Sequence, residues 1–402
     1  MANIAAFRES ISDVPDVTRT AVSPAASIGP TRTERFTRWF LVVALIYLLI
    51  SAVSVISSGF RTATGDQAEE LFQFATNPFI GLVVGIIATA LIQSSSTVTS
   101  IIVGLVAGGL PVSVAVPMVM GANIGTTVTN TLVSLGFVRE KEEFKRAFSA
   151  ATVHDFFNLL AVAIFLPLEI MFGFLERVAV PLAEPLSGSG DYSVDDANLI
   201  GMATSPIKET ATGMMSFLPS AAAGIGMVLI GTTMIFMAIR YLGKLLKKLL
   251  VGRAQRVLNT AIGRGPVSGM VSGATATVLV QSSTTSTCLM IPLAGSGALS
   301  LRQIYPFTIG ANLGTTMTAL LASTAATGPL AVHALEIALV HLLFNIFAMV
   351  VIFALPLLRN VPIRGAEWLA ALALKNKTYA IAWVVVTFLA VPALLILASA
   401  LL

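Results

Sequence analysis

The chain has 402 residues, of which 56% are hydrophobic and only 11% are charged. This composition excludes a soluble globular protein and indicates an all-α polytopic membrane protein. A single cysteine, Cys288, excludes an internal disulfide bond and a metal site built from cysteines, and the small net charge of +4 matters less than where the charges lie.

The predicted elements alternate between long apolar spans and two interrupted ones. Residues 1–36 are polar and lack the charged start and apolar core of a signal peptide, so we expect a disordered cytoplasmic tail. Apolar stretches that predict membrane crossings follow at 39–58, 112–136, 146–173, 215–239, 303–325, 331–357 and 379–401. Two further stretches, 78–110 and 266–297, carry a polar run at mid-length. We expect each of them to enter the membrane and turn back as a re-entrant hairpin.

The basic residues support this arrangement of about seven full crossings and two hairpins. With the N-terminus in the cytoplasm, all but three of the 24 Lys and Arg residues fall on the cytoplasmic side, and only Arg61, Arg177 and Lys208 lie outside. Cytoplasmic loops of membrane proteins carry such an excess of positive charge. If either hairpin crossed fully, the later loops would change sides and this bias would be lost.

The sequence also contains an internal repeat. IQSSSTVTS at 92–100 returns as VQSSTTSTC at 280–288, GANIGTTVT at 121–129 returns as GANLGTTMT at 310–318, and HDFFN at 154–158 returns as HLLFN at 341–345. Each copy is therefore a re-entrant hairpin, a broken helix and a helix. Because three predicted crossings separate the hairpins, the copies enter the membrane from opposite faces. Such an inverted repeat is typical of secondary transporters.

The repeat divides the chain into five parts. After the tail, we expect the first transmembrane helix with repeat 1 at 37–176 and an extracytoplasmic linker at 177–214. Repeat 2 with its leading helix follows at 215–358, and a cytoplasmic connection with the C-terminal membrane helix completes the chain at 359–402.

The Gly-Ala-Asn-x-Gly-Thr-Thr segments allow two interpretations. Glycines four residues apart, beside asparagine and threonine, favour an unwound stretch whose carbonyl groups bind a cation. The same small residues also suit a close contact between two helices. Because the segment occurs twice beside a duplicated polar hairpin, we favour the unwound stretch.

The polar runs of the hairpins predict an anion site. Apart from Arg146 at the first position of the span 146–173, no Lys or Arg lies in the predicted spans, so an anion at mid-membrane must be bound by other groups. Helices that begin near Ser94 and Ser282 would present free backbone N–H groups, a positive dipole end and hydroxyl donors. Gln93 and Gln281 would brace the hairpin tips or join the ion shell. The remaining negative charge then requires a co-bound cation, and sodium suits such oxygen ligands. The alternative is that the serines only bond to their own helix and pack closely.

Ionisable side chains inside the predicted spans are few, and they are costly there unless they are used. Asp155 has no acidic counterpart in the second copy, where Leu342 stands, so we expect it to bind a monovalent cation. The alternative is a protonated carboxyl group that braces a neighbouring helix. A scaffold role is expected for the residues that do recur, His154, His341, Asn158 and Asn345.

These motifs resemble a known family. QSSSTVTS, MGANIGTTVTNT and FKRAFSAATVHDFFN followed by LPLE resemble the first repeat of the type II sodium-phosphate cotransporters, and the stretch from VQSSTTST to HLLFN resembles the second. The resemblance implies sodium-driven uptake of inorganic phosphate by alternating access, with phosphate between the two hairpins. The linker is short and has no cysteine, whereas animal members carry a large disulfide-bonded loop there. This difference fits a compact bacterial version in the inner membrane.

The resemblance also assigns site residues by their position in the family's motifs. It implies a phosphate shell of Gln93, Ser94, Ser95, Ser96, Gln281, Ser282, Ser283 and Thr284. It implies sodium ligands at Thr89, Gln93, Asn123, Thr126, Thr127, Asp155, Gln281, Asn312, Thr315 and Thr316. Electrogenic members carry Ala, Ala and Asp where electroneutral members carry Ser, Ser and Gly, and here Ser149, Ala151 and Asp155 form a mixed set. Because the aspartate is the ligating group, we expect an extra sodium ion and electrogenic transport.

The expected partners are inorganic phosphate, sodium ions and membrane lipid, with a homodimer left open. We expect no enzyme activity, no nucleic acid and no cofactor other than sodium as the coupling ion. Hydroxyls and helix ends bind any small oxyanion, so the alternative function is sodium-coupled symport of a dicarboxylate or sulfate. A passive anion channel and an intramembrane serine hydrolase remain as further alternatives, and the hydrolase would need a nucleophile paired with a histidine and an oxyanion hole.

Overall fold

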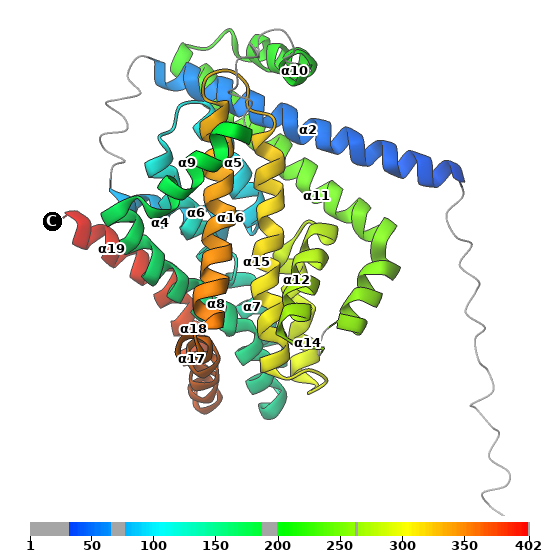
Figure 1. Ribbon diagram of the computed structural model, residues 1–402, viewed down its shortest axis with the longest axis vertical. Coiled ribbons are helices and arrows are strands. Elements are labelled where there is room, and N and C mark those ends of the chain that lie inside the picture. The colour runs from blue at the N-terminus through cyan, green and yellow to red at the C-terminus, as the bar shows by residue number, and fades with distance from the viewer. Residues whose placement is uncertain (1–31, 66–76, 187–198, 262–263, 401–402) are drawn as a thin grey trace, which may run out of the picture. The chain divides into compact units, whose positions relative to one another are not determined.

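The computed structural model describes residues 32–65, 77–186, 199–261 and 264–400. Every regular element in these ranges is a helix, which confirms the all-α prediction (Figure 1). The chain separates into two units, and the second, Val42–Leu402, contains both hairpins. Most of the expected tail lies outside the described residues, although α2 (Arg32–Thr64) already begins within it.

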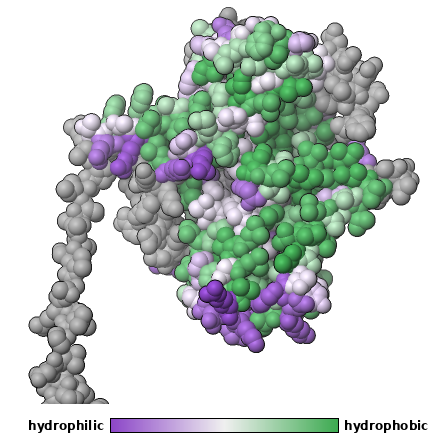
Figure 2. Space-filling model, turned by 180° about the vertical axis from the view of Figure 1, so that it is seen from behind, coloured by the Kyte–Doolittle hydropathy of each residue, from purple (hydrophilic) through white to green (hydrophobic). Residues whose placement is uncertain are grey.

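Among the described residues, six helices are long and apolar enough to cross a membrane. They are Phe36–Thr64, Val112–Phe137, Lys141–Phe172, Ser220–Leu242, Ala331–Ala354 and Thr378–Leu397. These correspond to six of the seven predicted crossings. The seventh falls on α15 (Leu301–Ser323), which has 23 residues but is not among the six, so the count of seven stays a prediction. Figure 2 shows apolar side chains over most of one face of the protein, a surface that suits contact with lipid.

Both polar runs interrupt a helix, as the sequence predicts. The first hairpin consists of α4 (Pro78–Ile92) and α5 (Ser95–Ala107). The second consists of α12 (Pro266–Val280) and two short helices, α13 (Ser283–Cys288) and α14 (Met290–Gly295). A helix of 15 residues such as α4 is about 22 Å long, whereas the hydrocarbon core of a bilayer is about 30 Å thick. Helices this short agree with hairpins that turn back inside the membrane.

The helix that follows each hairpin differs between the two copies. In the first copy, α6 (Val112–Gly125) ends before Thr126, and α7 (Val128–Ser134) and the 3-10 helix η4 (Leu135–Phe137) follow. In the second copy, α15 runs through its Gly-Ala-Asn-x-Gly-Thr-Thr segment without interruption, so the expected break is wrong there. The Thr315 and Thr316 hydroxyls donate to the carbonyl groups of Ala311 and Leu313, which a continuous helix permits.

The glycines of these segments make close contacts between helices. α6 packs against α4, and α15 packs against α12. A Cβ atom added to Gly121 would lie 2.0 Å from the carbonyl oxygen of Leu82, and one added to Gly310 would lie 1.9 Å from that of Met270. Only glycine permits so close an approach. The geometry therefore supports the packing interpretation, which the sequence placed second, in both copies, whereas the expected interruption of the helix is present only in the first copy.

Gly121→Ala is expected to destabilise the protein by about 1–3 kcal/mol, because the added methyl group forces α4 and α6 apart. Gly213 in α10 (Leu199–Met215) provides a matched control, since nothing lies within 4 Å of a Cβ added there. Gly213→Ala should leave the stability unchanged or raise it by up to about 1 kcal/mol. Thermal unfolding of both variants in detergent tests this, and equal melting temperatures would contradict the close contact.

The remaining helices either complete one of the two copies or lie outside the repeat. α8 (Lys141–Phe172) and α9 (Phe174–Leu186) complete the first copy, and α16 (Ala331–Ala354) follows α15 in the second. The long α11 (Ser220–Ala261) packs against α5 and α12. The expected linker at 177–214 contains the end of α9 and most of α10, and its residues 187–198 lie outside the described ranges. The expected connection contains α17 (Pro356–Lys375), which precedes α18 (Thr378–Val385), the π-helix η6 (Val386–Ala390) and α19 (Val391–Ala400).

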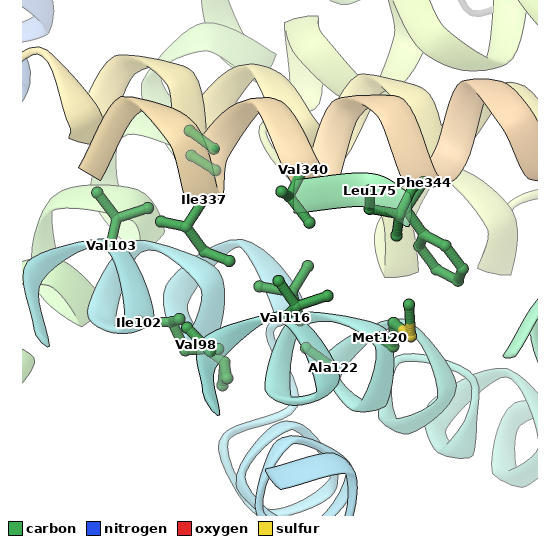
Figure 3. Packing of buried hydrophobic residues seen from close by; sticks show 14 of the residues in the cluster. Val98, Ile102, Val103, Val116, Met120, Ala122, Leu175, Ile337, Val340 and Phe344 are labelled. Carbon is green, nitrogen blue, oxygen red and sulfur yellow. The ribbon is translucent and has the colours of Figure 1, made fainter. Parts of the chain in front are cut away.

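The apolar core joins the two copies. Figure 3 shows α16 of the second copy packed against α5 and α6 of the first, with Ile337 and Phe344 facing Val103, Val116 and Met120. All five side chains are buried. Through this packing the second copy contacts α5, which begins at the tip of the first hairpin, and α6, which follows that hairpin.

Candidate functional site

The two hairpin tips line one cavity of about 380 Å³, although they lie far apart in the sequence. Ile92, Gln93, Ser94 and Thr97 come from the first hairpin, Val280, Gln281, Ser282 and Thr285 come from the second, and Phe236, Ile239, Arg240 and Lys244 come from α11. Pockets of this size hold small ligands. The two polar runs therefore line the same cavity, as predicted.

The glutamines end the first helix of each hairpin. Gln93 and Gln281 have φ angles of 59° and 55°, and they are the only positive values outside glycine in the described part of the chain. This left-handed conformation stops a helix. The side-chain amide of Gln93 donates to the carbonyl group of Ala90, and that of Gln281 donates to the carbonyl group of Val278 over 2.7 Å. Each glutamine thereby satisfies a carbonyl group that the helix end leaves free.

The same two side chains tie each hairpin tip to a neighbouring helix. The Gln93 amide oxygen accepts a hydrogen bond from the hydroxyl group of Thr129 in α7. In the second copy, the Gln281 amide oxygen accepts one from Thr318 in α15, at 3.2 Å. Both the donor and the acceptor of each amide are therefore used within the protein. Of the two roles expected for the glutamines, the geometry favours bracing of the tip.

The serines that follow the glutamines cap the next helix. The Ser94 hydroxyl oxygen accepts hydrogen bonds from the Thr97 backbone N–H at 3.3 Å and from the Thr97 hydroxyl group at 2.9 Å. The Ser282 hydroxyl oxygen accepts one from the Thr285 N–H at 3.1 Å. A serine oxygen has two lone pairs, so Ser94 has only its own O–H left to give. A group that can only donate is suited to an anion.

Half of the predicted phosphate shell lines the cavity. Gln93, Ser94, Gln281 and Ser282 do so. Ser95, Ser96 and Ser283 are buried and Thr284 is half-buried, and none of these four lies in the cavity wall. The first turn of α5 nevertheless places the backbone N–H groups of Ser95 and Ser96 directly after the tip, where a helix offers them no internal acceptor.

The asparagines of the Gly-Ala-Asn segments bind the opposite copy. The Asn123 side-chain nitrogen donates to Asn345 Oδ1 at 2.9 Å, and its oxygen lies 3.2 Å from His341 Nε2. The arrangement recurs with the copies exchanged, because Asn312 donates to Asn158 Oδ1 at 2.7 Å and its oxygen lies 2.6 Å from His154 Nε2. All six side chains are buried. Each copy's asparagine is thus held by the other copy's His-x-x-x-Asn pair, in agreement with the expected scaffold role.

Asp155 is buried, lies outside the wall of the cavity and accepts hydrogen bonds from two neighbouring side chains. One carboxylate oxygen, Oδ2, accepts from the indole N–H of Trp383 at 2.7 Å and from the Thr131 hydroxyl group at 3.5 Å. The other, Oδ1, is buried and has no hydrogen-bond partner. A buried carboxylate oxygen without a donor is costly. The position therefore suits a bound cation, as well as the alternative of a protonated carboxyl group.

The remaining predicted sodium ligands are threonines. Thr89 lies in α4 of the first hairpin, and the others lie on or beside the helices that follow the hairpins. The Thr89 hydroxyl group is buried without a hydrogen-bond partner. The Thr126 and Thr127 hydroxyls donate to backbone carbonyl groups of the preceding turn, as do those of Thr315 and Thr316. A hydroxyl group that donates in this way keeps lone pairs for a cation. Within the described ranges, no group of three or more His, Cys, Asp and Glu side chains is placed to hold a metal ion.

Three residues of the candidate sites were not predicted from the sequence: Arg240, Lys244 and Trp383. The premise that no cationic side chain lies near the anion site is wrong, because α11 continues past the expected span end at residue 239 and carries Arg240 and Lys244 into the cavity wall. The spacing of Phe236, Arg240 and Lys244 was the available signal, since residues four apart share a helix face. Trp383 lies in the last predicted crossing, and nothing in the sequence linked it to Asp155.

Comparison with known proteins agrees with this geometry. Residues 48–178 and 234–361 match the Na+/Pi-cotransporter family, and each of the two stretches contains one hairpin. Sodium-dependent phosphate transport protein 2A of Rattus norvegicus is 35% identical over 88% of this chain and 66% of its own length. Sodium-dependent phosphate transport protein 2B is 32% identical in Bos taurus and 29% identical in Homo sapiens, over 88% of this chain and 64% of each relative.

The chain thus spans somewhat less than two thirds of the curated relatives that it matches. No solved structure matches it. The family match nevertheless covers more than half of the 402 residues and includes both hairpin tips. This chain belongs to the Na+/Pi-cotransporter family.

Proposed function

We propose that the chain is a sodium-coupled secondary transporter that imports inorganic phosphate, and that it is not an enzyme. We place it in a bacterial inner membrane with its N-terminus in the cytoplasm. The observation that carries the proposal is the single cavity shared by the two helix breaks. The names of the relatives, which are sodium-dependent phosphate transport proteins, support it.

Phosphate binds between the tips in this proposal. The O–H groups of Ser94 and Ser282 donate to phosphate oxygens, and the first N–H groups of α5 add donors and the positive end of a helix dipole. Hydrogen bonds to a charged acceptor are roughly twice as strong as neutral ones. The braced glutamines fix the tips so that these donors are already oriented when the anion arrives.

In this proposal sodium binds at Asp155, at Thr89 in the first hairpin and at the threonines of the helices that follow the hairpins. Asp155 Oδ1 and Thr89 Oγ1 are the two buried, unpartnered oxygen atoms in the predicted set. A cation at each would satisfy an oxygen atom that otherwise has no partner. If three sodium ions accompany one divalent phosphate, one net charge enters per cycle. A membrane potential of about 100 mV then contributes roughly 2.3 kcal/mol to accumulation.

The inverted arrangement supplies the alternating access. The tips, the bracing threonines and the asparagine pairs each occur once per copy, in equivalent positions of the two copies. Two nearly equivalent halves can exchange roles, so that the shared site opens first to one side of the membrane and then to the other.

Uptake of labelled phosphate into proteoliposomes tests the function. We expect accumulation that requires an inward sodium gradient, exceeds that of empty vesicles and is lost when potassium replaces sodium. Phosphate flux without sodium would indicate a passive channel. Stronger inhibition by succinate or sulfate than by unlabelled phosphate would indicate the other oxyanion symporters.

A further inference from the structure

The cavity between the hairpin tips carries positive charge that the site described above does not use. Arg240 and Lys244 line it, and no aspartate or glutamate does. In the part of the chain whose side chains are described, neither cation has a carboxylate within ion-pair distance. The wall therefore presents two uncompensated cations beside the hydroxyl groups of Ser94 and Ser282.

The course of α11 fixes these cations at the tips. Phe236, Arg240 and Lys244 are four residues apart and share one face of the helix, and that face forms a wall of the cavity. The helix packs against α5 of the first hairpin and α12 of the second. A helix held by both hairpins keeps its side chains between them.

The two cations differ in what else they contact. The Lys244 ammonium group lies 5.3 Å from the centre of the Tyr241 ring, so part of its charge is engaged in a cation–π contact. No such partner occupies Arg240 among the described residues. Its guanidinium group is planar, always charged and matched to bidentate binding of phosphate oxygens. Arg240 is therefore the stronger candidate.

We propose that Arg240 contacts phosphate in the cavity and makes the site prefer the dianion to the monoanion, with Lys244 as a weaker second cation. This inference rests on the proposed function and adds a specificity-determining side chain to it. The competing role is membrane anchoring, because Arg240 lies near the end of the apolar stretch Ser220–Leu242, where basic residues reach for lipid headgroups. The shared cavity wall with the two hairpin serines favours the substrate.

The test compares the KM for phosphate at about pH 6, where the monoanion dominates, with that at about pH 8, where the dianion dominates. Arg240→Gln should raise the KM about tenfold at the higher pH and less at the lower pH, because the lost contact is to a charged group. Arg240→Lys should recover part of the loss. Arg302→Gln is the matched control, since Arg302 is exposed at the start of α15 and lies outside the cavity wall.

The outcomes separate this inference from the function on which it rests. If the wild-type protein shows no sodium-dependent phosphate uptake, the proposed function fails. If the wild-type protein transports and Arg240→Gln keeps the wild-type KM at both pH values, this inference alone is overturned. A variant that loses folded protein or maximal rate with an unchanged KM would assign Arg240 to membrane anchoring and would also overturn it.

Charge can also be restored chemically at the same position. Arg240→Cys in a Cys288→Ala background, which must itself transport, offers one thiol for modification. An aminoethyl methanethiosulfonate reagent should lower the phosphate KM of this variant by attaching an ammonium group, and a sulfonatoethyl reagent should raise it by attaching an anion. Equal effects of the two reagents would contradict an electrostatic role.

Discussion

Ser94→Ala and Ser282→Ala should each raise the phosphate concentration for half-maximal uptake about 10- to 100-fold. Each substitution removes a hydrogen bond to a charged group, which is worth about 1.5–3 kcal/mol. Both hydroxyl groups line the same cavity, and that of Ser94 has its two lone pairs engaged by Thr97, so its remaining role is donation. Sodium-driven uptake of labelled phosphate over a range of concentrations measures the effect.

The capping role of these serines requires a control. Loss of a helix cap by itself costs about 0.5–2 kcal/mol of stability, whereas glycine at the same position costs only a few tenths. Ser94→Gly should therefore lose phosphate affinity and keep the fold, while Ser94→Thr should keep both. Ser100→Ala provides a matched change on the same helix, because the buried Ser100 hydroxyl donates to the Ser96 carbonyl group and lies outside the cavity wall. Wild-type affinity in both alanine variants would remove the serines from the site.

Asp155→Asn should abolish the transport current while phosphate uptake continues. The asparagine keeps the shape of the side chain and its contact with Trp383, but it removes the negative charge that balances the extra sodium ion. The ratio of charge moved to phosphate transported, from electrical recording and labelled uptake on the same vesicles, should fall from one to about zero.

Trp383→Phe separates the charge of Asp155 from its hydrogen bonding. This variant removes the 2.7 Å indole contact to Oδ2 and keeps the carboxylate. It should weaken sodium affinity and leave the ratio of charge to phosphate as in the wild type. An unchanged ratio in Asp155→Asn would contradict the assignment of Asp155 as the ligand that couples charge to transport.

The hairpin tips were predictable because their polar runs are short-range signals repeated in the sequence. A glutamine followed by hydroxyl residues inside an apolar stretch indicates a helix end and a new helix start, and the structure places both breaks there. The resemblance to the cotransporter family also implied that the breaks would meet. It did not reveal which hydroxyl groups face the cavity, because that depends on the direction in which each new helix leaves the tip.

The glycine segments and the cavity cations show where sequence reasoning fell short. Glycine signals a close approach and an unwound backbone equally, and only the position of the neighbouring helix decides between them; here Leu82 and Met270 occupy the space that a side chain would need. Arg240 lies one residue beyond the expected end of its span. Hydropathy marks where an apolar stretch ends, but a helix that carries its cations into a cavity continues past that point.

The central claim is that the two hairpin breaks form one phosphate site that requires sodium. Ile92→Cys and Val280→Cys, each in the Cys288→Ala background, place one thiol on each hairpin in the cavity wall. The most direct measurement is the rate at which a maleimide modifies these thiols as phosphate is added. Our account predicts that phosphate protects both positions at the same half-saturating concentration when sodium is present, and protects neither without it. Protection of one position alone, or of neither in the presence of sodium, would contradict it.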